Sequence, residues 1–287
     1  MFSRSFELTR YWFIAVNSRA SALLRISITL GSPCIVCNPP LLVGAVRFYF
    51  SLNGKPHNSR ARHAMRIDSH VHTYRSGDSR SPLSLVLRAA HKAGIDVLCI
   101  TDHGTIDGAL EAIEKASETS TPWKGGIVIG QECRTWAGEI IGLFLYERIP
   151  GNLHPHEVVA RIREQAGLVY IPHPFCRQHN GLQMEVLEEL VAEGMVDIVE
   201  VHNAKAQPCA NERALSFAVN HGLIGVAASD AHYPEFVGRA FVETETFEGI
   251  TPERIASDPT QFLRALSTGH LYKGTYSYAE AKWPKRV

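Results

Sequence analysis

Histidine and carboxylate side chains recur at one kind of position in this chain, directly after short apolar runs. The run 65–72, Met-Arg-Ile-Asp-Ser-His-Val-His, ends in His70 and His72. Strand side chains alternate between two faces, so a strand here would place both imidazoles on the same face. Such a pair can bind one metal ion, although by itself it is more often a pair of surface or hydrogen-bonded histidines. The later runs of the chain therefore decide its meaning.

Polar residues of the same kinds follow the later apolar runs. The candidates at expected strand ends are His70, His72, Asp78, Asp102, His103, Glu132, His173, His202, Asp230 and His232. Imidazole and carboxylate together suit zinc, manganese or iron, and a single zinc ion needs only three or four ligands. We therefore expect two or three divalent ions, with Glu132 as the bridging carboxylate. Two such ions can activate a water and polarise a phosphoryl oxygen.

Several of these residues also have a purely structural interpretation. Asp102 could cap a helix that begins near Thr105, and Asp78 could be a turn former. His173 could be a rigid loop residue between two prolines, and His202 could be packed at a strand end. We interpret six further histidines as surface residues: His91, His154, His156, His179, His221 and His270.

The alternation of apolar runs with amphipathic segments predicts the elements that position these side chains. Strands are expected at 65–72, 95–100, 126–129, 139–145, 168–171, 196–201 and 223–228 and near Phe241, with helices at about 83–93, 106–117, 156–165, 184–192, 211–220 and 259–266. The strand at 139–145 could form a hairpin with the preceding one. Ser81 is expected to cap the first helix, with Pro82 as its first residue and Gly94 ending it. Strand, polar residues, then helix, repeated six or seven times, predicts an α/β fold with a parallel sheet. In a closed barrel of such units, the C-terminal ends of the strands carry the active site.

Residues 1–64 differ in composition from the rest of the chain. Up to Met65 there are eight Arg or Lys residues and one acid, Glu7, whereas the whole chain has 29 basic and 29 acidic residues. The remainder is therefore acidic and lacks a general basic field for long duplex nucleic acid. The composition of residues 1–64 resembles a transit peptide, or upstream DNA read as protein, and we favour the second interpretation. We expect this segment to be poorly ordered, preceding one domain at 65–287.

Composition also limits the setting of the protein. Residues 26–46 carry no charge, but Gly31, Pro33, Pro39 and Pro40 interrupt them, so no membrane-spanning helix is expected. Six cysteines are too few for a disulfide framework at this length. The single motif Cys34-x-x-Cys37 favours neither a zinc nor a redox site. We expect a cytoplasmic protein, and the sequence leaves its oligomeric state open.

Five short motifs resemble, in order, those of the polymerase and histidinol phosphatase (PHP) family. They are His-Val-His-Thr, Thr-Asp-His-Gly, Gly-Gln-Glu, His-Pro-Phe-Cys-Arg and Ser-Asp-Ala-His, within residues 65–242. The resemblance implies a distorted (β/α)7 TIM-like barrel with a two- or three-metal site at the C-terminal ends of its strands. It also implies phosphoesterase activity of the short, stand-alone branch of the family.

The resemblance further implies roles for individual residues. One ion would be bound by His70, His72, Glu132 and Asp230, and a second by Asp78, His103, Glu132 and His173. His232, with His202, would serve a third ion or the substrate. Asp102 would support the ligands from behind, and Arg177 would bind the substrate phosphate.

We therefore expect a hydrolase of phosphate esters that uses two or three Mn, Zn or Fe ions. A nucleotide or oligonucleotide substrate is favoured, as for a nucleoside bisphosphate phosphatase or a 5′–3′ exonuclease. Its partners would be phosphorylated small molecules or short single-stranded nucleic acid ends. The alternatives are a histidinol-phosphatase-like enzyme, a C–N bond hydrolase of amidohydrolase type, and a metal-binding module without turnover. Arg177 argues against C–N hydrolysis, and the complete ligand set argues against the module.

Overall fold

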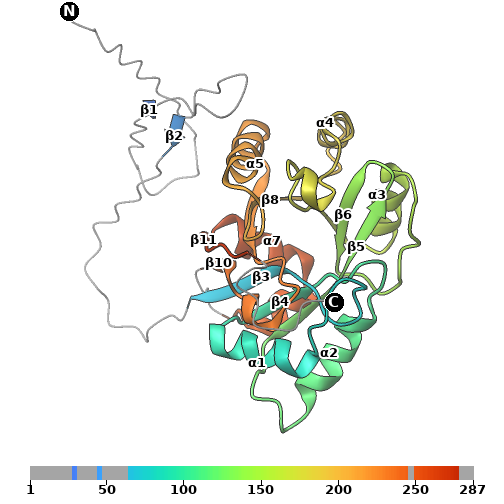
Figure 1. Ribbon diagram of the computed structural model, residues 1–287, viewed down its shortest axis with the longest axis vertical. Coiled ribbons are helices and arrows are strands. Elements are labelled where there is room, and N and C mark those ends of the chain that lie inside the picture. The colour runs from blue at the N-terminus through green and yellow to red at the C-terminus, as the bar shows by residue number, and fades with distance from the viewer. Residues whose placement is uncertain (1–27, 31–43, 47–63, 245–248, 278–287) are drawn as a thin grey trace, which may run out of the picture. The chain divides into compact units, whose positions relative to one another are not determined.

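The computed structural model describes residues 28–30, 44–46, 64–244 and 249–277, which belong to two separate units (Figure 1). In the unit Met1–Asn58, β1 (Ile28–Leu30) and β2 (Gly44–Val46) pair in antiparallel fashion. The Cys34-x-x-Cys37 motif and most of residues 1–64 lie outside the described residues. All other described elements belong to the unit Ser59–Val287.

A sheet of nine strands, in the order β11-β10-β3-β4-β5-β6-β7-β8-β9, forms the centre of this second unit. The strands are β3 (Met65–Val71), β4 (Val97–Ile100), β5 (Gly126–Thr135), β6 (Gly138–Leu143), β7 (Leu168–Ile171), β8 (Ile198–Asn203), β9 (Ile224–Ala228), β10 (Ala240–Thr244) and β11 (His270–Lys273). Past the end of β9, Ala231 forms a parallel bridge with Val71, and its carbonyl accepts from the His72 N–H at 3.0 Å. Seven strands, β3 to β9, thus form the nearly closed barrel that was predicted.

The prediction of a parallel sheet is correct for two halves of the barrel and wrong between them. β3, β4 and β5 are parallel, as are β7, β8 and β9, but β6 is antiparallel to both of its neighbours. The expected β5–β6 hairpin is confirmed, with Glu132 opposite Ile141. A hairpin has no crossover helix, so it reverses the strand direction. At the sheet edge, β10 is antiparallel to both β3 and β11.

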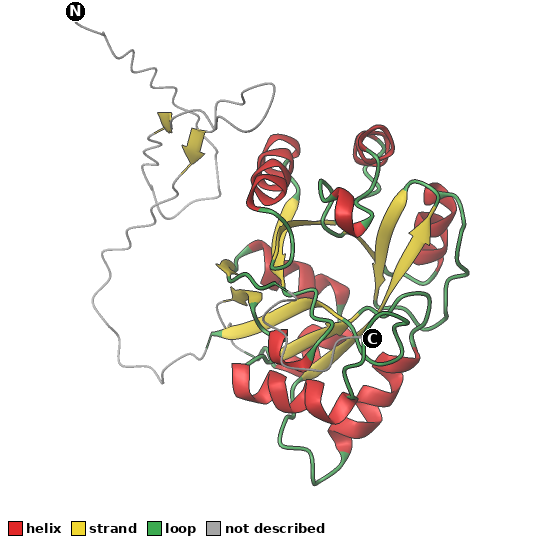
Figure 2. Cartoon of the chain, viewed as in Figure 1, coloured by secondary structure: helices red, strands yellow, loops and turns green. Residues whose placement is uncertain are grey.

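The helices lie on the outside of the curved sheet (Figure 2). They are α1 (Leu83–Ala93), α2 (Asp107–Ser117), α3 (Pro155–Glu164), α4 (Met184–Ala192), α5 (Pro208–His221), α6 (Pro252–Ser257) and α7 (Pro259–Ser267), with 3₁₀ turns η1 (Arg177–His179) and η2 (Pro234–Phe236). Gly94 ends α1 with a φ of 66°, as predicted. The predicted Ser81 cap is wrong, because extended Pro82 precedes α1 without a side-chain cap and the Ser81 hydroxyl instead donates to the His232 carbonyl.

Buried apolar side chains pack against one another along the strands, before the strand ends that carry the polar residues. Cys99, Val128, Ile141, Tyr170 and Ile198, from five successive strands, belong to one packed cluster. Strands covered on both faces need apolar residues throughout, so polar side chains gather where the strands end. None of the described helices is both long enough and apolar enough to cross a bilayer.

Candidate metal centre

The first strand brings His70 and His72 together, as their spacing predicts. His70 lies in β3 and His72 directly follows it, with their Nε2 atoms 3.0 Å apart. The ladder between β3 and β4 changes register between Asp68 and Val71. Both imidazoles are fully buried, and both face the same group of carboxylates.

Those carboxylates come from β5 and from the segment after β9. The Nε2 atom of His72 lies 3.2 Å from Glu132 Oε2 and 3.4 Å from Asp230 Oδ1, and the corresponding distances from His70 Nε2 are 3.3 and 3.6 Å. Ligands about 2.0–2.1 Å from a tetrahedral ion are separated by about 3.3–3.4 Å. His70, His72 and Glu132 are therefore spaced as one ion requires, and Asp230 lies beside the two histidines.

A second group lies across Glu132 from the first. Asp78 Oδ2 is 3.2 Å from the Nε2 atoms of both His103 and His232, and His103 Nδ1 is 3.4 Å from Glu132 Oε2. His173 approaches the other Glu132 oxygen, with its Nε2 atom 3.2 Å from Oε1. His232 thus lies with Asp78 and His103, and His173 lies beside Glu132. All eight expected metal ligands converge at one rim of the barrel.

The donor chemistry of this rim fits divalent cations. His103 Nδ1 and His173 Nδ1 are buried without hydrogen-bond partners, which is costly for an imidazole nitrogen. His72, Asp78, His103 and His232 form one group whose ligand atoms are close enough together to bind a single ion. Mixed imidazole and carboxylate donors are typical of zinc, manganese and iron sites.

Mutual attraction keeps the carboxylates ionised despite their burial. Burial raises the pKa of Glu132, but His70 and His103 lower it well below its ordinary value. Burial also raises the pKa of Asp230, but Lys205 and His70 outweigh it and lower the pKa well below the usual range. Burial lowers the pKa of His70, yet the surrounding carboxylates raise it well above its ordinary value. The carboxylates are therefore ionised, and a divalent cation could take the place of the His70 proton among them.

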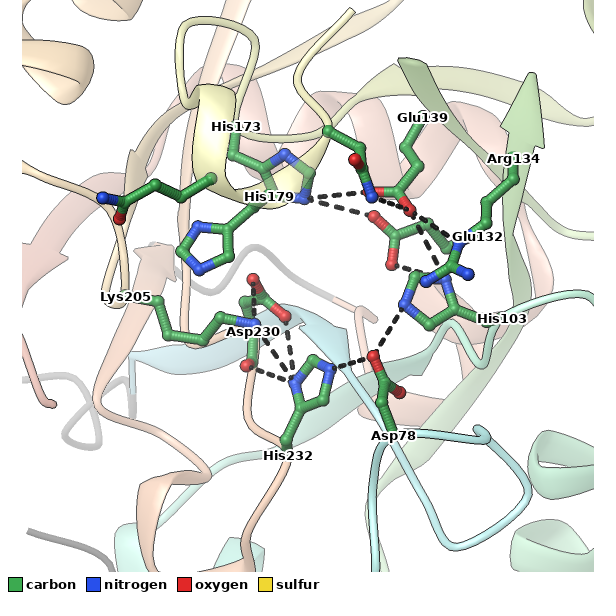
Figure 3. A pocket seen from close by; sticks show the side chains of 12 residues that line it. Asp78, His103, Glu132, Arg134, Glu139, His173, His179, Lys205, Asp230 and His232 are labelled. Carbon is green, nitrogen blue, oxygen red and sulfur yellow. Dashed lines mark hydrogen bonds and ion pairs between the residues drawn. The ribbon is translucent and has the colours of Figure 1, made fainter. Parts of the chain in front are cut away.

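A cavity of about 210 Å³ opens onto this rim (Figure 3). Its lining is Asp78, His103, Glu132, Arg134, Glu139, His173, Gln178, His179, Asn180, Lys205, Asp230 and His232. Lys205 and Arg134 come from opposite sides of the site in this view. The cavity thus combines six of the eight expected metal ligands with two cationic side chains.

Comparison with known proteins assigns the chain to a family. Residues 68–191 match the profile of the PHP domain and residues 208–271 that of the PHP-associated region. The protein MJ0417 of Methanocaldococcus jannaschii is 33% identical over 227 residues, which cover 77% of this chain and 88% of that protein. The chain belongs to the PHP family. A Caldicellulosiruptor bescii protein named "Probable phosphatase" is 24% identical over 199 residues, or 61% of this PHP chain and 83% of that protein.

Solved structures share the PHP fold. One is a two-domain protein of Bacteroides vulgatus described as containing a PHP-like metal-dependent phosphoesterase. It superposes with a TM-score of 0.58 at 17% identity, over 74% of this chain and 66% of that one. Another is PsfC of Pseudomonas syringae, with a TM-score of 0.53 at 19% identity over 71% of this chain and 96% of that one.

Asp102 lies behind the ligands of this PHP site. It is fully buried, and its two oxygens accept hydrogen bonds of 2.6 Å from the Thr73 N–H and hydroxyl. It does not cap α2, which begins after Ile106 without a side-chain cap. A Cβ on Gly108 would lie 1.9 Å from an Asp102 oxygen, so only glycine leaves room for this carboxylate. Asp102 therefore fixes the turn that follows His72.

The expectation that His202 serves an ion or the substrate is not supported. Its Nε2–H donates to the Gly274 carbonyl at 2.9 Å, and its Nδ1 accepts from the Asn211 amide at 3.3 Å. Burial lowers the pKa of His202, which agrees with a neutral ring used in this way. Both ring nitrogens are thus engaged away from the cavity.

The expectation that Arg177 binds phosphate is not supported either. Arg177 is exposed in η1 and does not line the cavity, whereas the next three residues do. The cations that line the cavity are Arg134, on β5, and Lys205, after β8. Neither cation belongs to the strand-end pattern of the sequence.

Glu200 is a further residue of the site that the strand-end pattern does not predict, and it is fully buried. Its Oε1 accepts from His70 Nδ1 at 3.1 Å and from the Tyr170 hydroxyl at 2.9 Å. Its Oε2 accepts from the His173 N–H at 2.7 Å and from the Asn203 amide at 2.9 Å. A His70 that donates through Nδ1 presents a lone pair on Nε2 to an ion. The signal was a carboxylate within the apolar run 196–201.

Proposed function

We propose that this PHP protein is a metal-dependent hydrolase of phosphate esters. The observation that carries the proposal is the meeting of six of the eight expected metal ligands with Lys205 and Arg134 in one cavity. Two or three divalent ions of Mn, Zn or Fe would neutralise phosphate charge and activate the attacking water. The ligands for them would be His70, His72, Asp78, His103, Glu132, His173, Asp230 and His232.

The protein's own cations would hold the phosphate beside those ions. The Lys205 ammonium is 2.9 Å from Asp230 Oδ2, and its side chain is only 7% exposed. Arg134 reaches the cavity from β5, held by its Nε–H bond of 3.1 Å to Glu139. A guanidinium can donate two parallel hydrogen bonds to phosphate oxygens, and an ammonium acts as a point charge. Fixed positive groups of this kind stabilise the charge that develops during attack.

These cations also favour phosphate over a C–N bond. Amide hydrolysis develops one oxyanion, which the metal ions can stabilise, and needs no additional cations around the leaving group. A phosphate dianion needs positive groups on more than one side. Lys205 and Arg134 lie on opposite sides of the cavity (Figure 3), so the amidohydrolase alternative is disfavoured.

The finer proposal is a nucleotide or oligonucleotide substrate. Two cations on opposite sides suit a substrate with more than one anionic group, such as a nucleoside bisphosphate or a 5′-phosphorylated oligonucleotide end. The alternative is a histidinol-phosphatase-like enzyme for small monoesters, in which both cations would contact the single phosphate.

Phosphate release after metal removal and replacement tests this function. Protein stripped with a chelator would be assayed with Mn²⁺, Zn²⁺ or Fe²⁺ against nucleoside 3′,5′-bisphosphates, short 5′-phosphorylated oligonucleotides, sugar phosphates and amino-alcohol phosphates. We expect release only with metal and most rapidly from the nucleotides. Hydrolysis of N-acyl substrates without any phosphate release would instead establish the C–N alternative.

A further inference from the structure

A second cavity, of about 470 Å³, adjoins the metal cavity. Its lining is Arg134, Thr135, Trp136, Ala137, Gly138, Glu139, Asn152, Asn180, Gly181 and Gln183. Arg134, Glu139 and Asn180 line both cavities. A molecule whose phosphate occupies the first cavity can therefore extend past these three residues into the second.

Trp136 is the large aromatic residue of this second cavity. It occupies the turn of the β5–β6 hairpin, and it is 59% exposed. An indole contributes a broad apolar face and one N–H donor. The indole ring packs with its centroid 5.6 Å from that of the His154 ring, and more than half of the residue remains accessible to an occupant of the cavity.

Hydrogen bonds fix the backbone of the hairpin turn that carries Trp136. The Thr135 hydroxyl accepts from the Ala137 N–H at 3.1 Å and donates to the Gly138 carbonyl at 2.7 Å. The Gln183 N–H donates to the Ala137 carbonyl at 2.7 Å. Gly138 has a φ of 129°, and a Cβ there would lie 2.6 Å from the Leu182 backbone.

The same connection fixes Trp136 relative to the metal cavity. The Glu139 N–H donates to the Asn180 carbonyl at 3.0 Å, and both residues line the metal cavity as well. The turn is thus preorganised, which lowers the entropy cost of binding against it.

The polar lining indicates the chemistry of the occupant. Asn152 and Gln183 carry exposed side-chain amides, each with donors and an acceptor. An aromatic face together with amide groups suits a planar, heteroaromatic group with hydrogen-bonding edges. Arg134, at the boundary, can bind an anionic or hydroxyl group between that ring and the phosphate.

We propose that the Trp136 cavity is a subsite for a heteroaromatic ring carried by the leaving alcohol of the phosphate ester, with this ring stacked on the indole. The proposal rests on the phosphoesterase function proposed above. The subsite is distinct from the metal cavity. A phosphate ester without the ring would therefore lose the contact with Trp136 but would still bind in the metal cavity.

A matched substrate pair tests the subsite: adenosine 5′-phosphate and ribose 5-phosphate, which share the ester and differ by the base. Base–aromatic stacking predicts that Trp136→Ala lowers kcat/KM for adenosine 5′-phosphate by roughly 5- to 150-fold, mainly through KM. Ribose 5-phosphate should change by less than twofold. Trp136→Phe should restore part of the loss. The control Tyr146→Ala removes another exposed aromatic residue that lies outside both cavities, and it should affect neither substrate.

Calorimetric binding of the same two phosphates with Mn²⁺ present gives a second readout. An affinity for adenosine 5′-phosphate that depends on Trp136 supports the subsite even if no phosphate is released, in which case only the phosphoesterase function fails. Equal losses for both substrates would show a general effect of Trp136 on the fold and would overturn the proposal. So would an unchanged kcat/KM for adenosine 5′-phosphate, or no binding of it by the parent protein.

Discussion

The Lys205 ammonium lies 2.9 Å from Asp230 Oδ2, while Oδ1 of the same carboxylate lies 3.4 Å from His72 Nε2. Asp230 thus stands between a fixed cation and the expected position of an ion. The loop that carries the lysine is held by the Asn203 side chain, whose Oδ1 accepts from the Lys205 N–H at 2.8 Å. A buried ammonium needs a partner, and an incoming phosphate oxygen could share it with Asp230.

Lys205→Met should therefore separate catalysis from metal binding. It keeps the apolar stem and removes the charge, so kcat/KM for a phosphate ester should fall by roughly 10²–10³. Lys205→Arg should recover part of the activity. Metal content, measured by plasma emission, should stay at the level of the parent protein.

Arg177→Met is the matched control for this loss of charge. Arg177 is exposed and lies outside the cavity lining, so its variant should remain within twofold of the parent. A large loss in Arg177→Met with little effect in Lys205→Met would restore the role that the sequence alone suggested for Arg177.

Glu132→Gln should release metal from two positions together. Glu132 Oε2 lies 3.2 Å from His72 Nε2, and Oε1 lies 3.2 Å from His173 Nε2, so one carboxylate faces both parts of the site. The Gln amide nitrogen cannot act as a ligand. Plasma emission after dialysis should show the loss of more than one ion equivalent per chain. Glu157→Gln is the control, because exposed Glu157 pairs with Arg161 on α3 and belongs to none of the candidate ion groups of the described residues. Full occupancy in Glu132→Gln would exclude Glu132 as a ligand.

The stability of the metal-free protein should depend on His179. Burial and nearby Lys205 lower the pKa of His179 to about 4, from 6.5 in an unfolded chain. Between these values the unfolded state binds more protons, so the stability due to neutral His179 is complete above about pH 6.5 and is lost as the pH falls toward 4. In His179→Gln, the difference in unfolding free energy between pH 7 and pH 4.5 should be smaller by about 1–2 kcal/mol, allowing for solvent screening.

Urea unfolding at the two pH values measures that difference. His270→Gln, at an exposed position of β11, is the control and should behave as the parent protein does. Identical pH dependence in His179→Gln and the parent would show that His179 is protonated equally in both states.

A chain that starts at Met65 should fold and function as the whole chain does. All nine strands of the large sheet lie between Met65 and Lys273, and residues 1–64 have a different composition. We propose that residues 65–287 form the catalytic domain and that residues 1–64 are dispensable. Melting temperature and turnover should be unchanged, whereas a loss of several degrees would show that the N-terminal segment stabilises the domain.

The order of strand ends made most of the site predictable from sequence. His70, Glu132, His173 and Asp230 each belong to a local pattern of an apolar run followed by a ligand-type residue. Barrel topology then brings successive strand ends to one rim. The convergence of these side chains thus follows from local patterns and a general rule of topology.

The remaining features depend on details that a local pattern does not contain. The ladder between β8 and β9 changes register between Glu200 and His202, and His202 binds the Gly274 carbonyl instead of facing the site. Arg177 begins the 3₁₀ turn η1 and is exposed there. The role of Lys205 arises only when its loop is placed against Asp230.

Glu200 should act as a positioning residue for the metal ligands. It is fully buried, and its two oxygens accept from His70, Tyr170, the His173 backbone and Asn203. Burial raises the pKa of Glu200, but His70 outweighs this and lowers it, so the carboxylate is ionised. In Glu200→Gln, an amide N–H₂ group replaces one carboxylate oxygen and faces N–H or O–H groups that previously donated to that oxygen. Mn²⁺ affinity should fall roughly 10- to 100-fold, and the free energy of unfolding by about 1–3 kcal/mol.

Tyr170→Phe separates these two effects of Glu200. It removes one donor to Oε1 and leaves the carboxylate and its bond to His70 in place. We therefore expect some loss of stability in urea and nearly unchanged Mn²⁺ affinity by calorimetry. If Glu200→Gln lost stability but bound Mn²⁺ as the parent does, Glu200 would support only the barrel interior. A loss of affinity in Glu200→Gln alone would mean that the His70–Glu200 hydrogen bond orients the imidazole toward the ion.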